Sequence, residues 1–199
     1  MESTWNNKVL SDMLGATEGT ALRVKQVALV VLGIAFLAVA AKIKVPMWPV
    51  PITMGTFAVL TIGAAYGARL GLVTIIGYMI VGALGFDVFA GSSAEKFGLT
   101  YMMGGTGGYL VGYVMATVAL GALAQRGWDR SVLWMALAML IGNVLIYVPG
   151  LAWLGQLYGW DKPILEWGLT PFLVGDALKL ALAALVLPAA WKLVGRARG

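Results

Sequence analysis

Long apolar runs that follow one another along almost the whole chain are the feature that most constrains its fold. A helix that crosses about 30 Å of hydrocarbon needs roughly 20 mostly apolar residues, within a range of about 17–25. Six segments meet this requirement: Val24–Ile43, Ile52–Ala68, Leu70–Phe86, Gly107–Gln125, a fifth that begins at Val132, and Pro171–Val194. The sequence therefore predicts an all-α integral membrane protein, built as a bundle of six transmembrane helices.

The composition also indicates burial in lipid rather than in water. Of the 199 residues, 60% are hydrophobic and only 12% are charged, whereas a soluble domain carries roughly 25% charged residues. We expect one membrane domain over residues 1–199, with a polar N-terminal segment at 1–22 and the helical bundle at 24–194. The first apolar run begins too late and is too long for a cleaved signal sequence, so we expect a retained anchor.

Several kinds of chemistry are excluded by the residues that the chain lacks. It has no cysteine and no histidine, so disulfides, thiolate nucleophiles, imidazole acid–base catalysis and the usual zinc ligand sets are ruled out. The phosphate-binding pattern GxxxxGK[ST] is also missing, so the chain cannot hydrolyse ATP in that way. We expect no enzyme activity, no bound metal and no cofactor.

The positive charges are distributed unequally between the two sides of the predicted bundle. The net charge of +5 forms no dense basic patch, which argues against nucleic acid as a partner. With the amino terminus placed in the cytoplasm, nine lysines and arginines fall on that side: Lys8, Arg23, Lys25, Arg69, Arg126, Arg130, Lys192, Arg196 and Arg198. Four fall on the other side: Lys42, Lys44, Lys96 and Lys162. Because cytoplasmic loops are enriched in these residues, both termini are predicted to be cytoplasmic.

Small residues recur four apart in the second, third and fourth runs. They are Gly63, Gly67 and Gly71, and then Gly104, Gly108, Gly112 and Ala116. Such stripes let helix backbones approach closely in lipid, and we favour packing inside the bundle over a docking face for a partner. The fifth helix is predicted to break near Pro149, because proline removes a backbone donor.

Asp176 and Lys179 are the two charged residues of the predicted spans that do not lie beside a loop. Three positions apart on a helix, they share one face. A charge in hydrocarbon is costly, so it normally faces the bundle interior and pairs or binds something. The pair is either an internal ion pair that holds the bundle together or, as we favour, the polar end of a ligand pocket.

The connection between the first two spans, KIKVPMWPVPITM, has three prolines within six residues. Proline fixes φ and removes a donor, so the segment is predicted to be a stiff extended loop on the outer face. Trp48 and Pro51 are either interfacial anchors and helix breakers or parts of a rigid lid over an apolar ligand.

The run GGTGGYLVGY, at residues 104–113, has five glycines in its first nine residues and opens the fourth helix. Glycines there permit a close backbone approach, and the N–H groups of a helix N-terminus suit an anionic or carbonyl-bearing ligand. On the fifth helix, Asn143 and Tyr147 are four apart and either bond to a neighbouring helix or add hydrogen bonds to the same cavity.

Three strings together resemble the BioY family, the biotin-specific S components of energy-coupling factor (ECF) transporters. They are PVPITMGTFAVL at 49–60, GGTGGYLVGY at 104–113 and GDALKLALAA at 175–184. The resemblance extends from the first span to the sixth. The sequence departs from the family's usual pattern at Gly55, where glutamine is usual, and at Gly105, where proline is usual.

The resemblance implies an S-component fold that captures biotin on the outer side of the cell inner membrane. It also implies partners, a transmembrane coupling subunit and two ATPases, which would supply the energy; association with further copies of the chain stays open. The residues implied to lie at the ligand are Asp176 and Lys179, the turn formed by Thr106, Gly107 and Tyr109, and the gate from Trp48 to Pro51.

Three other readings compete with biotin capture. The same scaffold could be tuned to another small vitamin, or the chain could be a membrane scaffold without a ligand. A membrane enzyme that uses Asp176 as an acid or base is weakened because no second carboxylate shares the spans. The face that docks on a coupling subunit is not assigned, because Ala35, Ala38 and Ala41 of the first helix step by three, whereas docking is often associated with alanines four apart.

Overall fold

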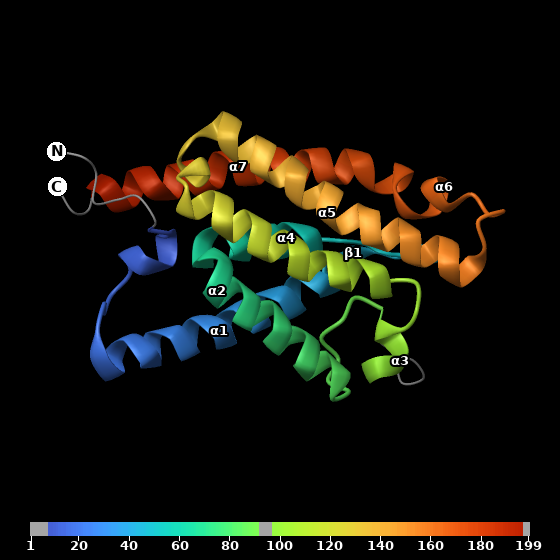
Figure 1. The fold of residues 1–199 in the computed structure, drawn as a ribbon, viewed down its shortest axis with the longest axis horizontal. Helices are drawn as coiled ribbons and strands as arrows, with labels where there is room; N and C mark the ends of the chain where they lie inside the picture. The colour runs from blue at the N-terminus through green and yellow to red at the C-terminus, as the bar shows by residue number, and fades with distance from the viewer. Residues whose placement is uncertain (1–7, 92–96, 197–199) are drawn as a thin grey trace.

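A computed structural model describes residues 8–91 and 97–196 of the chain. Long helices lie side by side in one bundle, with short elements at both ends (Figure 1). The long helices are α1 (Gly19–Lys42), α2 (Gly55–Ala83), α4 (Gly107–Gln125), α5 (Val132–Tyr158) and α7 (Leu173–Arg196). The shorter ones are η1 (Leu10–Met13), α3 (Gly98–Met102), η2 (Trp128–Arg130), α6 (Ile164–Gly168) and η3 (Thr170–Phe172).

Helix α2 reverses direction at Gly67, whose φ of 77° and ψ of 172° are not helical. A Cβ built on Gly71 would lie 3.5 Å from the Cα of Gly63, although eight residues of straight helix span about 12 Å. The two arms of α2 therefore form an antiparallel helical hairpin (Figure 1). Glycine suits this turn because a positive φ carries no steric cost without a Cβ.

Within the described residues, five helical segments are long and apolar enough to cross a membrane: α1, α2, α4, α5 and the segment from Ile164 to Val194 that includes most of α7. This confirms the prediction of a helical membrane bundle. Six crossings result if the two arms of α2 are counted separately, so that number stays a prediction. Helix α1 begins and α7 ends at the same end of the bundle (Figure 1), in line with the predicted common side of the termini.

The predicted break of the fifth helix near Pro149 is wrong, because α5 continues as one helix through Pro149 to Tyr158. Proline removes the hydrogen bond to the carbonyl four residues earlier, here that of Leu145. That carbonyl lies against α4, only 2.9 Å from where a Cβ of Gly112 would stand. In a membrane a helix tolerates proline when a neighbouring helix covers the freed backbone group, which the sequence pattern alone does not reveal.

The short elements define two ends of the bundle. At one end, β1 (Lys44–Val45) and β2 (Ile52–Thr53) pair antiparallel and form a β-hairpin, beside α3 and α6. We call this end, which lies opposite the Gly67 turn of α2, the hairpin end. The prediction that the segment between the first two spans is extended rather than helical is confirmed. The pairing of β1 with β2 was not predicted. At the opposite end, the η1 end, lie η1, the Gly67 turn and η2. There the indole of Trp191 donates a hydrogen bond to Asp129 at 2.5 Å.

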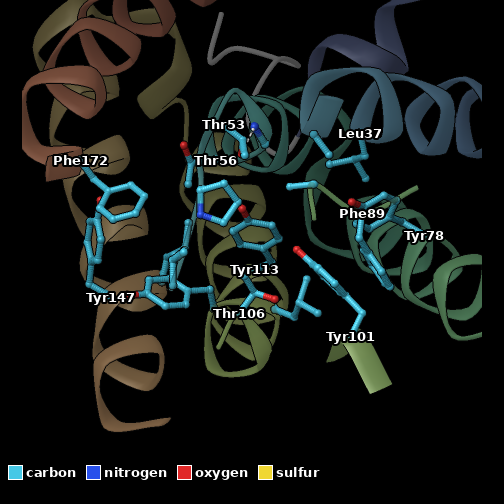
Figure 2. Close-up of a pocket in the computed structure, with 18 of the residues that line it drawn as sticks. Leu37, Thr53, Thr56, Tyr78, Phe89, Tyr101, Thr106, Tyr113, Tyr147 and Phe172 are labelled. Atoms are coloured by element: carbon cyan, nitrogen blue, oxygen red, sulfur yellow. Dashed lines mark hydrogen bonds between the residues drawn. The ribbon is translucent and has the colours of Figure 1, made fainter. Parts of the chain in front are cut away.

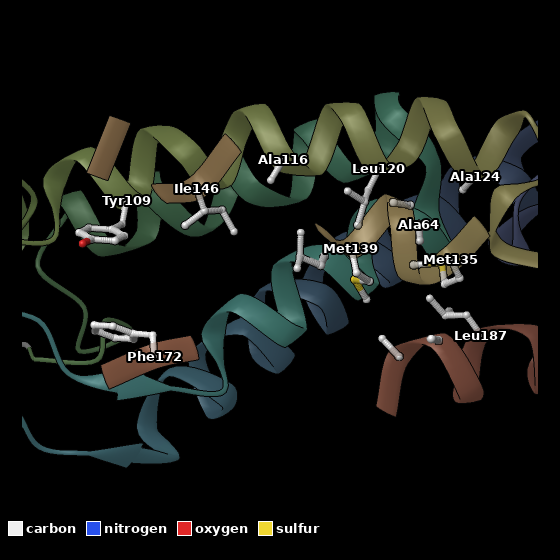
Figure 3. Close-up of a cluster of buried hydrophobic side chains, with 14 of the residues drawn as sticks. Ala64, Tyr109, Ala116, Leu120, Ala124, Met135, Met139, Ile146, Phe172 and Leu187 are labelled. Atoms are coloured by element: carbon white, nitrogen blue, oxygen red, sulfur yellow. The ribbon is translucent and has the colours of Figure 1, made fainter. Parts of the chain in front are cut away.

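Two clusters of buried side chains form the core. One lies between the first arm of α2, α4, α5 and α7 and includes Leu120, Met139 and Ile146 (Figure 3). The other joins α1 to both arms of α2 and includes Leu37, Ile75 and Tyr78. Each long helix therefore contributes to at least one cluster.

The glycine stripes pack inside the bundle, as favoured from the sequence. A Cβ on Gly63 would lie 2.7 Å from the carbonyl oxygen of Thr117 in α4. On Gly121 it would lie 2.2 Å from the backbone nitrogen of Ala68, and on Gly112 it would lie 2.6 Å from the Cα of Ile146 in α5. Backbone contact of this kind supplies helix association in lipid, where the hydrophobic effect is absent.

We predict that Gly112→Ala lowers the stability of the bundle by about 1–3 kcal/mol, because the added methyl group meets the backbone of α5. The measurement is the melting temperature of the purified chain in detergent. Gly175→Ala is the matched control, since a Cβ there would meet nothing closer than 3.9 Å. A Gly112→Ala chain that melts at the wild-type temperature would contradict the close approach of α4 and α5.

Candidate functional site

A cavity lies between the two core clusters at the hairpin end of the bundle (Figure 2). It encloses about 660 Å³ of empty space, the open solvent at its mouth included. Its apolar wall includes Leu37, Val50, Phe89, Leu110, Ile146 and Phe172. Its polar wall includes Thr53, Thr56, Tyr78, Tyr101, Thr106, Tyr109, Tyr113, Tyr147 and Lys179.

A buried ion pair forms one side of the cavity. The Lys179 ammonium lies 3.0 Å from Asp176 Oδ1 and donates a second hydrogen bond of 3.0 Å to the hydroxyl of Thr56. The side chains of Lys179 and Asp176 are only 11% and 7% exposed. The hydroxyl of Tyr147 donates to the other carboxylate oxygen of Asp176. The carboxylate is thus engaged on both oxygens.

Three helices meet in this network, because Thr56 lies in the first turn of α2, Tyr147 lies on α5, and Asp176 and Lys179 share one face of α7. An ammonium has three donors, and two of them are used by Thr56 and Asp176. Among the residues that the structure describes, one N–H of Lys179 therefore has no acceptor. Asp176 does not line the cavity itself, and its two oxygens accept hydrogen bonds from Lys179 and Tyr147.

Tyrosines from α4 line the adjoining part of the wall, with the Tyr109 ring centroid 6.2 Å from that of Tyr147. Tyr109 and Tyr113 are one helical turn apart, and the Tyr109 hydroxyl donates a hydrogen bond of 2.7 Å to the carbonyl of Gly168. The hydroxyl of Tyr113 lies beside Gly55, 3.2 Å from where a Cβ would stand. The missing side chain of Gly55 therefore leaves space for the Tyr113 hydroxyl. Tyrosine offers an apolar ring and a polar tip, which suits an amphipathic ligand.

A second hollow opens outside the first, around the β1–β2 hairpin. It shares Pro51, Ala90, Tyr101 and Thr106 with the inner cavity, so these residues form the boundary between the two. Trp48 lies in the outer hollow, is 65% exposed, and packs edge-on against Tyr158 and Trp167, with ring centroids 5.5 Å and 5.0 Å away. Beside the hairpin, Lys42 pairs with Asp87 at 2.5 Å.

The structure brings five of the nine residues predicted at the ligand to the wall of the cavity: Pro51, Thr106, Tyr109, Tyr147 and Lys179. Asp176 lies directly behind this wall. Trp48 lies in the outer hollow. Gly107 faces Met102 and Trp153, and Asn143 lines a separate groove between α5 and α7. The role of each residue in binding a ligand stays a prediction.

Several residues of the wall, such as Thr56, Tyr78 and Tyr101, were not predicted from the sequence. Tyr78 lies in the second arm of α2, where nothing in the local sequence separates a cavity-facing tyrosine from one that faces another helix. Tyr113 could have been predicted as a wall residue, because it follows Tyr109 by one helical turn in the glycine-rich motif.

Comparison with known proteins gives one consistent result. The family model described as the BioY family matches residues 12–196. A probable biotin transporter BioY of Pyrococcus horikoshii is 38% identical over 83% of this chain and 95% of its own length. The biotin transporter BioY of Thermotoga maritima is 32% identical over 76% of this chain and 87% of its own length.

A solved structure has the same fold. It is a crystal structure of the S-component for biotin from an ECF-type ABC transporter, with a TM-score of 0.73 over 88% of this chain and 95% of that chain. Its sequence identity is 20%, so this likeness concerns the fold. The relatives and the five apolar helices together indicate a multi-pass membrane protein.

We predict that Asp176→Leu alone destabilises the chain by about 3–5 kcal/mol, because the buried ammonium of Lys179 then has no counter-charge. The double variant Asp176→Leu/Lys179→Met removes both charges and should recover most of this loss. Thermal melting of the two purified variants in detergent measures the difference. Equal melting temperatures for the single and double variants would contradict the importance of the pair.

Proposed function

The chain belongs to the BioY family, and from this membership we propose that it captures biotin for import across the cell inner membrane. The observation that carries the proposal is the cavity at the hairpin end, with the buried Lys179 fixed in its wall by Asp176 and Thr56. On the predicted orientation this end faces outward.

The chemistry of biotin matches the two kinds of wall. Biotin has a ureido group with two N–H donors and one carbonyl, an apolar thioether ring and an anionic valerate tail. The remaining N–H of Lys179 can donate to the ureido oxygen or to the tail. The hydroxyl oxygens of Thr56, Thr106 and Tyr113 offer acceptors for the ureido N–H groups. Leu37, Phe89 and Ile146 would pack against the ring.

Asp176 has a different part in this proposal from the one expected from the sequence. As an exposed acceptor it would bind the ureido N–H groups directly, but it does not line the cavity, and each of its oxygens accepts a hydrogen bond within the protein. We therefore assign it to positioning. It holds the ammonium of Lys179 and the hydroxyl of Tyr147 at the cavity, which reduces the entropy that ligand binding would otherwise cost.

The outer hollow supplies a route for entry. A ligand that reaches the hollow beside Trp48 meets the inner cavity at Pro51 and Thr106. A movement of the β1–β2 hairpin, which carries Pro51, would open the boundary between the outer hollow and the inner cavity. Trp48, packed on Tyr158 and Trp167, would hold the hairpin closed over the ligand.

Energy for import has to come from elsewhere, since the sequence contains no phosphate-binding loop. We propose that the chain works with a transmembrane coupling subunit and two ATPases of an ECF transporter. The chain itself carries out capture and release, without a chemical step.

We predict tight binding of biotin by the purified, detergent-solubilised chain, measured by isothermal titration calorimetry. The double variant Asp176→Leu/Lys179→Met should bind at least about thirtyfold more weakly, since removing a buried charged contact costs about 2–5 kcal/mol. Lys162→Met is the matched control, because Lys162 is half-exposed and pairs only with Asp161.

Two results would overturn the proposal. A folded wild-type chain that does not bind biotin would leave a membrane protein with another ligand or none, and competition with other vitamins would identify a change of substrate. A folded double variant that binds biotin as tightly as the wild type would remove Lys179 from the site.

A further inference from the structure

A second polar hollow lies at the η1 end of the bundle, far from the biotin cavity in the fold. It is formed by η1, the start of α1, the Gly67 turn of α2 and the last residue of α4. It holds about 830 Å³ of empty space, its mouth included. Its polar lining includes Asp12, Lys25, Gln26, Arg69 and Gln125. Nothing in the proposed capture of biotin uses these residues.

The ionisable groups of this hollow favour an anion. Asp12 is engaged, because its carboxylate accepts a hydrogen bond of 3.0 Å from the backbone N–H of Val9. Lys25 is held in place by hydrogen bonds to the carbonyls of Ser11 and Leu14, at 3.2 Å and 2.9 Å. Two cations and one acid leave a net charge of +1 in the lining.

Arg69 is the group that the protein leaves available. It follows the Gly67 turn and is exposed. Within residues 8–91 and 97–196 it has no hydrogen-bond or ion-pair partner. A guanidinium presents its donors as a planar fork, which matches two oxygens of a phosphate. The side-chain amides of Gln26 and Gln125 add donors at the same hollow.

The other wall of the hollow is apolar and opens towards lipid. It is formed by Leu22, Leu29, Leu70 and Val73, of which Val73 is 56% exposed. The exposed apolar face of α1 is close by in sequence, with Val24 and Val27 both 64% exposed. A molecule that fills this hollow would therefore have a charged head and a hydrocarbon part. A free inorganic anion would leave the apolar wall without a partner.

We propose that this hollow binds the phosphodiester headgroup of an anionic phospholipid, with Arg69 as the principal contact and one acyl chain along Leu70 and Val73. The η1 end is the predicted cytoplasmic end, so the lipid would come from the inner leaflet. Basic pockets between transmembrane helices on the cytoplasmic side are suited to such headgroups. A bound lipid would brace the Gly67 turn against η1, which Lys25 already ties to α1.

Native mass spectrometry of the detergent-solubilised chain, titrated with phosphatidylglycerol or phosphatidylcholine, tests this proposal. We expect phosphatidylglycerol to bind about five- to tenfold more tightly than phosphatidylcholine, and Arg69→Gln to abolish this preference. Arg69→Lys should retain part of it, since the charge remains. Arg23→Gln, which removes an exposed cation of α1 outside the hollow, should keep the full preference.

The contradicting outcomes are distinct from those of the biotin proposal. Equal binding of the two lipids by the wild type, or an unchanged preference in Arg69→Gln, would overturn the lipid site. Displacement of phosphatidylglycerol by equimolar inorganic phosphate would also overturn it in favour of a free anion. Biotin affinity should be the same in Arg69→Gln and in the wild type, so a failure of either proposal can be recognised separately.

Discussion

The close approach of α4 to its neighbours is the contact on which the rest of the bundle depends. Gly121 meets the Gly67 turn of α2 and Gly112 meets α5, each at backbone distance. In lipid such contacts replace the hydrophobic effect as the source of helix association. At the hairpin end the same helix carries Tyr109 and Tyr113, whose rings face the cavity. One helix therefore supplies both the packing of the bundle and one wall of its site.

The charges buried on α7 are stabilised by hydrogen bonds in the wall of the cavity. A lone ammonium in hydrocarbon would be costly, and Asp176 and Thr56 reduce this cost without using all the donors of Lys179. The two readings of the pair made from the sequence, ion pair and ligand site, are therefore compatible. The carboxylate holds the ammonium, and the ammonium is left with a donor for a ligand.

Much of the fold could be predicted because membrane helices depend on length and composition. Local spacing predicted that the glycines of α2 and α4 pack inside the bundle. It also predicted the extended loop around Trp48 and the proximity of Asp176 and Lys179. The uninterrupted path of α5 was not, because the partner that covers the carbonyl of Leu145 lies on α4, distant in sequence. The wall residues Thr56, Tyr78 and Tyr101 were missed for the same reason, since the cavity exists only where separate helices meet.

The central claim is that biotin lies in the cavity at the hairpin end with Lys179 as a direct contact. A crystal or cryo-electron microscopy structure of the chain with biotin tests it most directly. We expect biotin to lie between Tyr113, Tyr147 and Phe89, with a polar atom within about 3.2 Å of Lys179 Nζ. Biotin bound elsewhere, or bound in the cavity with Lys179 still turned only to Asp176 and Thr56, would contradict it.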